Sequence, residues 1–171
     1  MFVQDQLVVY PAQGVGKIES LKQQEFGGVT AEFYIIRILA SNITVMVPVS
    51  NAVNVGLRKL CTKKQAQKVL DSFADRSAFT GYTGQNWNRR YREYTERLKS
   101  TSLIDVCHVL KELILISGEK DLSFGERRLL EQAMGLVTSE LSCVLERPAN
   151  GIKAEIEEFF VDILQREEST T

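Results

Sequence analysis

The sequence predicts an α+β protein in which a small N-terminal antiparallel β domain is followed by an all-α helical domain. β-Branched and aromatic segments alternate with turn signals over residues 1–60. From about residue 62 the apolar residues recur with helical spacing, behind Ser, Thr and Asn residues suited to helix starts. A chain of 171 residues has room for two small domains. We therefore expect domains at 1–60 and 61–171, joined near residues 58–64.

The β domain is predicted from five short segments separated by the turn-forming sequences "PAQGVG", "EFGG" and "ASN". Five short strands in succession are typical of a strongly bent antiparallel sheet or a small barrel. Pro48 lies inside the fourth segment, and because proline cannot donate to a ladder, that strand is expected at an edge or a bulge. The expected strands cover residues 6–10, 15–20, 32–38, 43–49 and 55–60.

The helical domain is predicted from its capping residues. Thr62 and Asn86 can each accept a hydrogen bond from the first turn of a helix. Two further helix starts have the spacing of a capping box, formed by Ser102 with Asp105 and by Ser123 with Glu126. Pro148 then breaks the chain before a last amphipathic helix. The expected helices cover residues 63–75, 87–100, 103–117, 124–146 and 152–167.

Composition excludes several classes of protein. The net charge is −1, so contact with nucleic acid must come from a local patch. No apolar run approaches the roughly 20 residues that span a bilayer, and the N-terminus lacks the pattern of an export signal. Three widely spaced cysteines fit neither a zinc cluster nor a disulfide framework. We expect a cytoplasmic protein that uses no cofactor or metal and contacts no membrane.

Motifs that carry catalytic chemistry are scarce. The "GVG" at residues 14–16 lacks the third glycine and the following helix of a dinucleotide-binding turn. There is neither a P-loop nor the turn that presents a serine nucleophile. His108, the only histidine, is expected to be a helix-packing residue. We predict that the protein is not an enzyme.

The stretch "NWNRRYRE" combines the only tryptophan with a cluster of arginines. Trp87 takes the first helical position, and Arg89, Arg90 and Arg92 follow in the first two turns. Cations there oppose the helix dipole by about 0.3–1 kcal/mol each, so helix stability alone does not select this order. Guanidinium groups beside a helix N-terminus are suited to phosphate. Residues 85–99 carry five cations against two carboxylates, a net charge of +3.

Two interpretations of Trp87 remain open from the pattern alone. Tyr91, Tyr94 and Leu98 recur at i, i+3 and i+7, which is typical of a core-facing stripe. Trp87 lies four residues before Tyr91 and could extend that stripe as a packing residue. Alternatively, it is an apolar wedge of the kind that minor-groove binders insert between base steps.

Over residues 2–146 the sequence resembles the CarD/CdnL family of bacterial transcription regulators, and it looks closest to the CdnL branch. The resemblance is carried by "VVYPAQGVG" at 8–16, by "FYIIRIL" and "ITVMVPVSNAVNVGLRKL" within 33–60, and by "WNRRYREYTERLKS" with "DLSFGERRLLEQA". It implies a Tudor-like β domain that binds the β subunit of RNA polymerase. It also implies a helical domain that contacts promoter DNA at the upstream edge of the transcription bubble and stabilises the open complex.

The resemblance also implies residue roles. In such proteins the tryptophan of a W-x-R-R motif wedges into the minor groove while basic neighbours hold the backbone. These roles carry over to Trp87 and to Arg89, Arg90 and Arg92. Since the contacts fall on phosphates and groove shape, we expect little base specificity and a strong salt dependence.

The polymerase-binding surface is implied to include the strand "TVMVP". An edge strand with unpaired backbone groups is suited to pairing with a partner strand. The alternative is an edge strand whose proline merely discourages pairing. The implied contact residues are Ile35, Thr44, Val45, Met46 and Pro48.

The chain departs from the family pattern in two places. Members often carry Gly-Asp before the first strand, where this chain has Asp5 and Gln6, so the first turn is expected to differ. The segment from Pro148 onward lies outside the resemblance, and its apolar face could pack on the helical domain or meet another protein. The competing function is a protein–protein adaptor that does not bind DNA and in which Trp87 is buried. A monomer is expected in either case.

Overall fold

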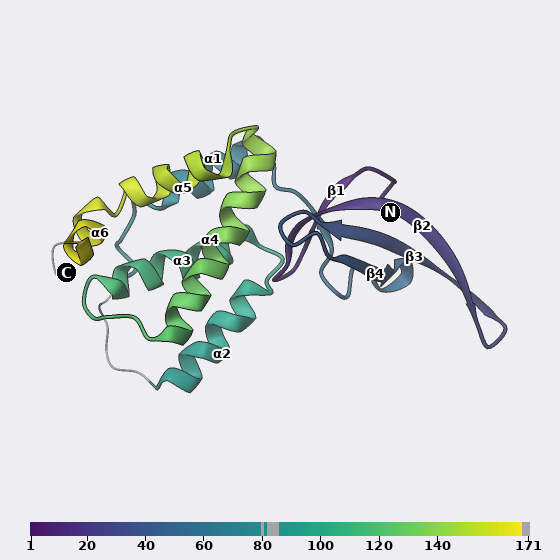
Figure 1. Cartoon of the computed structure of the whole chain (residues 1–171), viewed down its shortest axis with the longest axis horizontal. Coiled ribbons are helices and arrows are strands. Elements are labelled where there is room, and N and C mark those ends of the chain that lie inside the picture. The colour runs from purple at the N-terminus through teal and green to yellow at the C-terminus, as the bar shows by residue number, and fades with distance from the viewer. Residues whose placement is uncertain (80, 82–85, 169–171) are drawn as a thin grey trace. The chain divides into compact units, whose positions relative to one another are not determined.

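The computed structural model describes residues 1–79, 81 and 86–168. The chain divides into two compact units, Met1–Leu60 and Cys61–Thr171. The first unit is built on an antiparallel sheet and the second on α-helices (Figure 1), which confirms the predicted α+β class. No helix among the described residues is long and apolar enough to cross a membrane.

The sheet of the first unit has five strands in the order β4-β3-β2-β1-β5. All of the recorded pairings are antiparallel. The position of β4 at one edge confirms the prediction made from Pro48. Since β5 forms the other edge, the sheet of the described residues is open between β4 and β5. The strands are β1 (Leu7–Tyr10), β2 (Gly14–Phe26), β3 (Val29–Ile38), β4 (Thr44–Pro48) and β5 (Arg58–Lys59), and a 3₁₀ turn, η1 (Val49–Asn51), follows β4.

The β2–β3 hairpin extends well beyond the two predicted segments (Figure 1). Its turn is Gly27-Gly28, with φ angles of 57° and 82°. Two successive positive φ angles are those of the tight hairpin turn that matches strand twist, and glycine adopts them without a steric penalty. The cross-strand pair Phe26 and Val29 closes this turn. The residues of β2 before this turn are mostly polar and show no apolar alternation, so the sequence pattern did not predict this part of the strand.

One face of the sheet carries the core of the first unit. Tyr34 is buried there, and its hydroxyl accepts a hydrogen bond from the Phe2 N–H at 3.0 Å. Asp5, at the position where the family often has glycine, has a φ of 69°. Its N–H donates to the Ile18 carbonyl at 2.7 Å, so the first turn forms with an aspartate in the left-handed region. Other core residues are Val8, Ile36, Ile38, Val47, Ala52 and Leu57.

The second unit contains the described helices. α3 packs against α4, and α1, α2 and α5 pack against one or both of these two helices. The apolar stripe of α3 is almost wholly buried and includes Val109, Leu110 and Leu113, each 0% exposed. The helices are α1 (Lys63–Ser72), α2 (Trp87–Leu98), α3 (Leu103–Ser117), α4 (Phe124–Leu145), α5 (Ala149–Glu158) and α6 (Val161–Glu168).

Three of the four predicted helix caps form as expected. The capping side chains of α1, α2 and α4 are Thr62, Asn86 and Ser123. The fourth prediction is wrong, because the side chain of Ser102 makes no capping bond to α3. The Asp105 carboxylate instead accepts from the Ser100 hydroxyl at 2.6 Å. Ser100 Oγ in turn accepts from the Ser102 N–H at 3.1 Å, so a serine two residues upstream orders this turn.

The C-terminal segment forms two helices instead of the single predicted helix over 152–167. α5 ends at a break around Phe159, and the following Phe160 is 0% exposed. Arg76 holds the break: its guanidinium donates to the Phe159 carbonyl at 2.7 Å and to both carboxylate oxygens of Asp162 at 2.8 and 2.9 Å. The apolar face of this segment therefore packs within the helical unit.

Candidate functional site

The first candidate surface lies at the start of α2. The Asn86 side chain accepts from the Asn88 N–H at 2.9 Å and fixes the helix start. Arg89 and Arg92 are both exposed. Arg89 Nε lies 3.4 Å from Glu93 Oε1 in a pair that is open to water. Because exposed pairs of this kind contribute little energy, Arg89 can exchange its carboxylate for a phosphate at small cost.

Trp87 is half-buried, and its ring is seated against the first turn of α4. A Cβ atom added to Gly125 would stand only 2.9 Å from Trp87 Cζ2, so the ring lies directly on the glycine backbone. The Tyr91 ring is also in contact, with a centroid separation of 5.6 Å. Trp87 thus extends the helical core, as one interpretation expected, and the residue stays partly exposed, as the other required.

The buried stripe of α2 differs from the predicted one. Tyr94 and Leu98 are each 2% exposed, as predicted, but Tyr91 is 47% exposed. The buried positions of the helix are Arg90, Tyr94 and Leu98, a spacing of four residues. An arginine thus occupies the place that the pattern gave to a tyrosine. It can do so because a carboxylate meets it there.

That carboxylate belongs to Glu126 of α4. Arg90 Nη2 lies 3.5 Å from Glu126 Oε2, and the two side chains are 7% and 3% exposed. The guanidinium also lies over the Trp87 ring, 5.5 Å from its centroid. The resemblance had assigned Arg90 to phosphate contact together with Arg89 and Arg92. The structure instead places its charge inside the helical unit, away from the exposed surface.

Glu126 has two roles. Its Oε1 accepts from Lys120 Nζ at 2.6 Å and from the Ser123 N–H at 3.2 Å, which confirms the predicted capping box. Burial alone would raise the pKa of Glu126, but the hydrogen bonds from Lys120 and Ser123 outweigh it and lower that pKa below its ordinary value. The carboxylate therefore stays ionised and neutralises Arg90.

The substitution Glu126→Gln gives a prediction with a defined pH dependence. A carboxyl group whose pKa is lowered by folding stabilises the native state above its unfolded pKa, here near 4.5, and loses this contribution as the pH falls through the folded pKa. We expect the free energy of unfolding of wild type to exceed that of Glu126→Gln by up to about 3 kcal/mol at neutral pH, because the change removes the carboxylate that faces the buried Arg90 guanidinium. Urea unfolding across pH should show this difference constant down to about pH 5 and smaller below it. A difference that grows on acidification would contradict the assignment.

Phe124 was not singled out from the sequence. It is the first residue of α4, directly before Gly125, and its side chain is 83% exposed. Arg127 and Arg128 follow in the same helix and are exposed as well. The signal available in the sequence was a large aromatic residue immediately after the helix cap Ser123, outside the apolar spacing of the helix.

The second candidate surface is the outer face of β3 and β4. Met46 pairs with Ile35 across the two strands and is 45% exposed. Because side chains alternate along a strand, Thr44 and Pro48 share this face with Met46. Val45 does not, since it packs against the buried core of the first unit. The resemblance implied that the whole strand contacts the partner. The alternation of side chains along the strand instead places Val45 on the face opposite to Met46.

The outer edge of β4 is free of any partner strand among the described residues. Such an edge presents backbone N–H and C=O groups that can pair with a strand from another protein. Pro48 removes one donor at the end of the strand. The outer face and this free edge together form one continuous surface.

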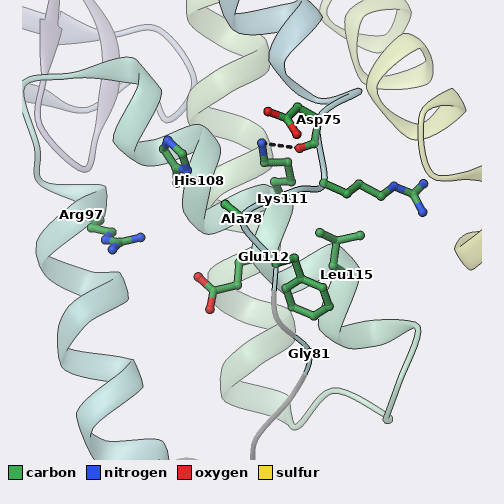
Figure 2. Close-up of a pocket in the computed structure, with 10 residues that line it drawn as sticks. Asp75, Ala78, Gly81, Arg97, His108, Lys111, Glu112 and Leu115 are labelled. Carbon is green, nitrogen blue, oxygen red and sulfur yellow. Dashed lines mark hydrogen bonds between the residues drawn. The ribbon is translucent and has the colours of Figure 1, made fainter.

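A pocket of about 280 Å³ lies elsewhere in the helical unit, lined by the α1–α2 connection, α2 and α3 (Figure 2). His108 is exposed at this pocket, so the expectation that it packs between helices is wrong. Lys111 Nζ donates to the carbonyls of Ser72 and Asp75 at 3.1 and 2.9 Å. An ammonium group there satisfies the last carbonyl of α1 and one carbonyl of the turn that follows, so this cation stabilises the fold. The pocket includes neither Trp87 nor its exposed arginine neighbours.

The chain thus combines a β unit that has an open sheet edge with a helical unit that exposes aromatic and arginine side chains. Residues 2–61 match the model of the CarD-like/TRCF RID domain, and residues 68–157 match that of the CarD C-terminal domain. The chain belongs to the CarD-like family of transcription regulators. It is 28% identical over 141 residues to "Putative transcription factor YdeB" of Bacillus subtilis (strain 168), a match that covers 80% of this chain and 88% of the relative. The C-terminal match extends into α5, beyond the limit of the resemblance seen from the sequence.

Proposed function

We propose that this protein regulates transcription initiation in the cytoplasm by binding the β subunit of RNA polymerase and promoter DNA. In this proposal the first unit binds the polymerase, and the second binds DNA at the upstream edge of the bubble and stabilises the open complex. The observation that carries the proposal is the half-buried residue Trp87, whose ring contacts Gly125 and whose neighbours Arg89 and Arg92 are exposed.

The geometry at α2 suits a wedge. An aromatic ring already fixed by packing loses little conformational entropy when it enters a base step. Unstacking a step costs a few kcal/mol, and this cost is smallest where the duplex is already opening. Arg89 and Arg92 would hold the phosphates beside the ring. The surface should therefore prefer a fork to an intact duplex while reading little of the sequence.

The first unit supplies the second half of the mechanism. Its partner surface comprises the free edge of β4 and the outer-face residues Ile35, Thr44, Met46 and Pro48. A protein held on polymerase through this surface has a raised effective concentration at the promoter, so a weak DNA site suffices. Tighter binding to melted than to closed DNA then shifts the equilibrium towards the open complex.

A second candidate function is a protein–protein adaptor that does not bind DNA. The contact between Trp87 and Gly125 favours it, because a packing residue would show the same contact. The partner would again occupy the β3–β4 surface. In both cases we propose a binding protein and not an enzyme. Burial raises the pKa of the Cys107 and Cys143 thiols, which disfavours the thiolate form that a nucleophile requires.

The DNA half of the proposal predicts a salt-dependent affinity. With two to four phosphates contacted, we expect log K for a forked duplex to fall against log salt with a slope of about −2 to −4. Arg92→Ala should reduce the magnitude of this slope by about 1. Fluorescence anisotropy with labelled forked and intact duplexes measures both effects.

The matched control is Lys153→Ala, which removes one exposed cation from α5 in the same unit and should leave the slope unchanged. If the affinity for the forked duplex does not depend on salt, the function as a protein–protein adaptor explains the surface better. One fixed sequence bound orders of magnitude more tightly than all others would contradict the shape-based mechanism.

A further inference from the structure

Arg90 is the buried arginine of α2, and it is 6% exposed. We propose that Arg90 is a positioning residue: its buried pair with Glu126 fixes the orientation of the Trp87 ring. The consequence for DNA rests on the proposed function, whereas the positioning itself concerns contacts within this chain alone.

The contacts form a chain from the ring to the backbone of α4. The guanidinium lies 5.5 Å from the Trp87 centroid, within the range of a cation–π contact. Its Nη2 lies 3.5 Å from Glu126 Oε2. Glu126 is itself fixed, because its Oε1 accepts from the Ser123 N–H at the start of the helix. The place of the cation over the ring is thus set by the first turn of α4.

Gly125, the residue before Glu126, provides a second contact from the same turn. Its Cα lies so close to the ring that a Cβ would stand 2.9 Å from Trp87 Cζ2. Real Cβ atoms essentially never approach so closely, so the ring would have to move if Gly125 were alanine. One turn of α4 therefore supplies both the seat of the ring and the carboxylate that holds the cation over it.

Lys120 contributes to the same arrangement. Its Nζ lies 2.6 Å from Glu126 Oε1, which leaves Oε2 facing Arg90. An apolar side chain at position 90 would continue the buried stripe of Tyr94 and Leu98, and it would need no counter-charge. What the charged pair adds is direction, and a directional contact can select one ring orientation where apolar packing allows several.

The test uses Trp87 as its own probe, because it is the only tryptophan of the chain. The variants are Arg90→Met, which keeps length and removes charge, and the double variant Arg90→Met with Glu126→Gln. We expect each to shift the Trp87 emission maximum to the red, to increase acrylamide quenching and to weaken the near-UV circular dichroism band. Gly125→Ala should also alter these signals, by displacing the ring from its seat.

The double variant separates positioning from stability. Arg90→Met leaves Glu126 with Lys120 and Ser123 as partners, whereas the double variant removes both members of the Arg90–Glu126 pair, so we expect the two variants to differ in their urea unfolding midpoints. The Trp87 signals of the double variant should nevertheless remain those of Arg90→Met. It also carries the test if Arg90→Met does not fold. Leu141→Ala serves as a matched control: it creates a cavity in α4 about 22 Å along the helix from Glu126 and should leave the Trp87 signals unchanged.

Forked-DNA affinity, measured on the same variants, distinguishes this inference from the proposed function. Altered Trp87 signals with an affinity about 10-fold lower support both, because a misplaced wedge loses its stacking contact. Altered signals with unchanged affinity support the positioning role and argue against Trp87 as a DNA wedge. Unchanged signals in a folded variant without the Arg90 charge overturn the inference, whatever happens to DNA binding.

Discussion

Trp87→Ala is expected to raise the Kd for forked promoter DNA by about 10-fold or more, because a stacking aromatic side chain contributes about 1–3 kcal/mol per base. Arg89 and Arg92 remain in place, so residual binding should keep its salt dependence. The lifetime of the open complex on a promoter fragment should fall in parallel. Co-purification with bacterial RNA polymerase should be unchanged, since the change lies outside the first unit.

The control must account for the packing of Trp87 as well as its exposure. Leu164→Ala removes a half-buried residue from α6 that packs against the same core. It should destabilise the helical unit without affecting DNA. If Trp87→Ala binds the fork as wild type does, Trp87 is a packing residue and "NWNRRYRE" is no more than a helix start.

Met46→Arg is expected to abolish co-purification with RNA polymerase while the protein stays folded. Met46 is 45% exposed on the outer face of an edge strand, so an arginine there can extend into water in the free protein. In a complex the same charge would be buried against the partner. Disrupting a central interface residue costs about 2 kcal/mol or more, which corresponds to a roughly 30-fold loss of affinity. Pull-down of purified polymerase, followed by titration against the β subunit, measures the loss.

Val29→Arg is the matched control for this change. Val29 is also an exposed apolar residue of β3, at 69% exposure, but lies about 20 Å along the strand from Ile35. Equal losses from both changes would mean that any added charge on the sheet disrupts binding, and the β3–β4 surface would lose its assignment. If wild type itself does not bind polymerase, the adaptor function with another partner is the one that remains.

Much of the fold follows from local signals in the sequence. Turn chemistry and β-branched residues locate the strands, and the cap residues Thr62, Asn86 and Ser123 locate three of the helix starts. The missed features depend on longer-range contacts. The β2–β3 hairpin is long because a glycine pair closes a polar ladder that has no apolar alternation. The last helix is broken because Arg76, far earlier in the chain, holds the break through Asp162.

The candidate site shows the same limit. Helical spacing identified Tyr94 and Leu98 as core residues, and the motif directed attention to Trp87. Spacing could not show that Arg90 turns inward, because its partner Glu126 lies 36 positions away on another helix. Nor could composition show that Val45 faces the core, although strict alternation along the strand would have separated it from Met46.

The capping box at Ser123 has a consequence for the dynamics of the wedge. Trp87 belongs to α2, but its ring is held in place by α4, because the first turn of α4 carries Gly125, which contacts the ring, and Glu126, which pairs with Arg90. Helix termini fray more readily than helix interiors. Whatever loosens the N-terminus of α4 should therefore release the ring, and amide exchange at that turn should rise and fall together with the mobility of the tryptophan.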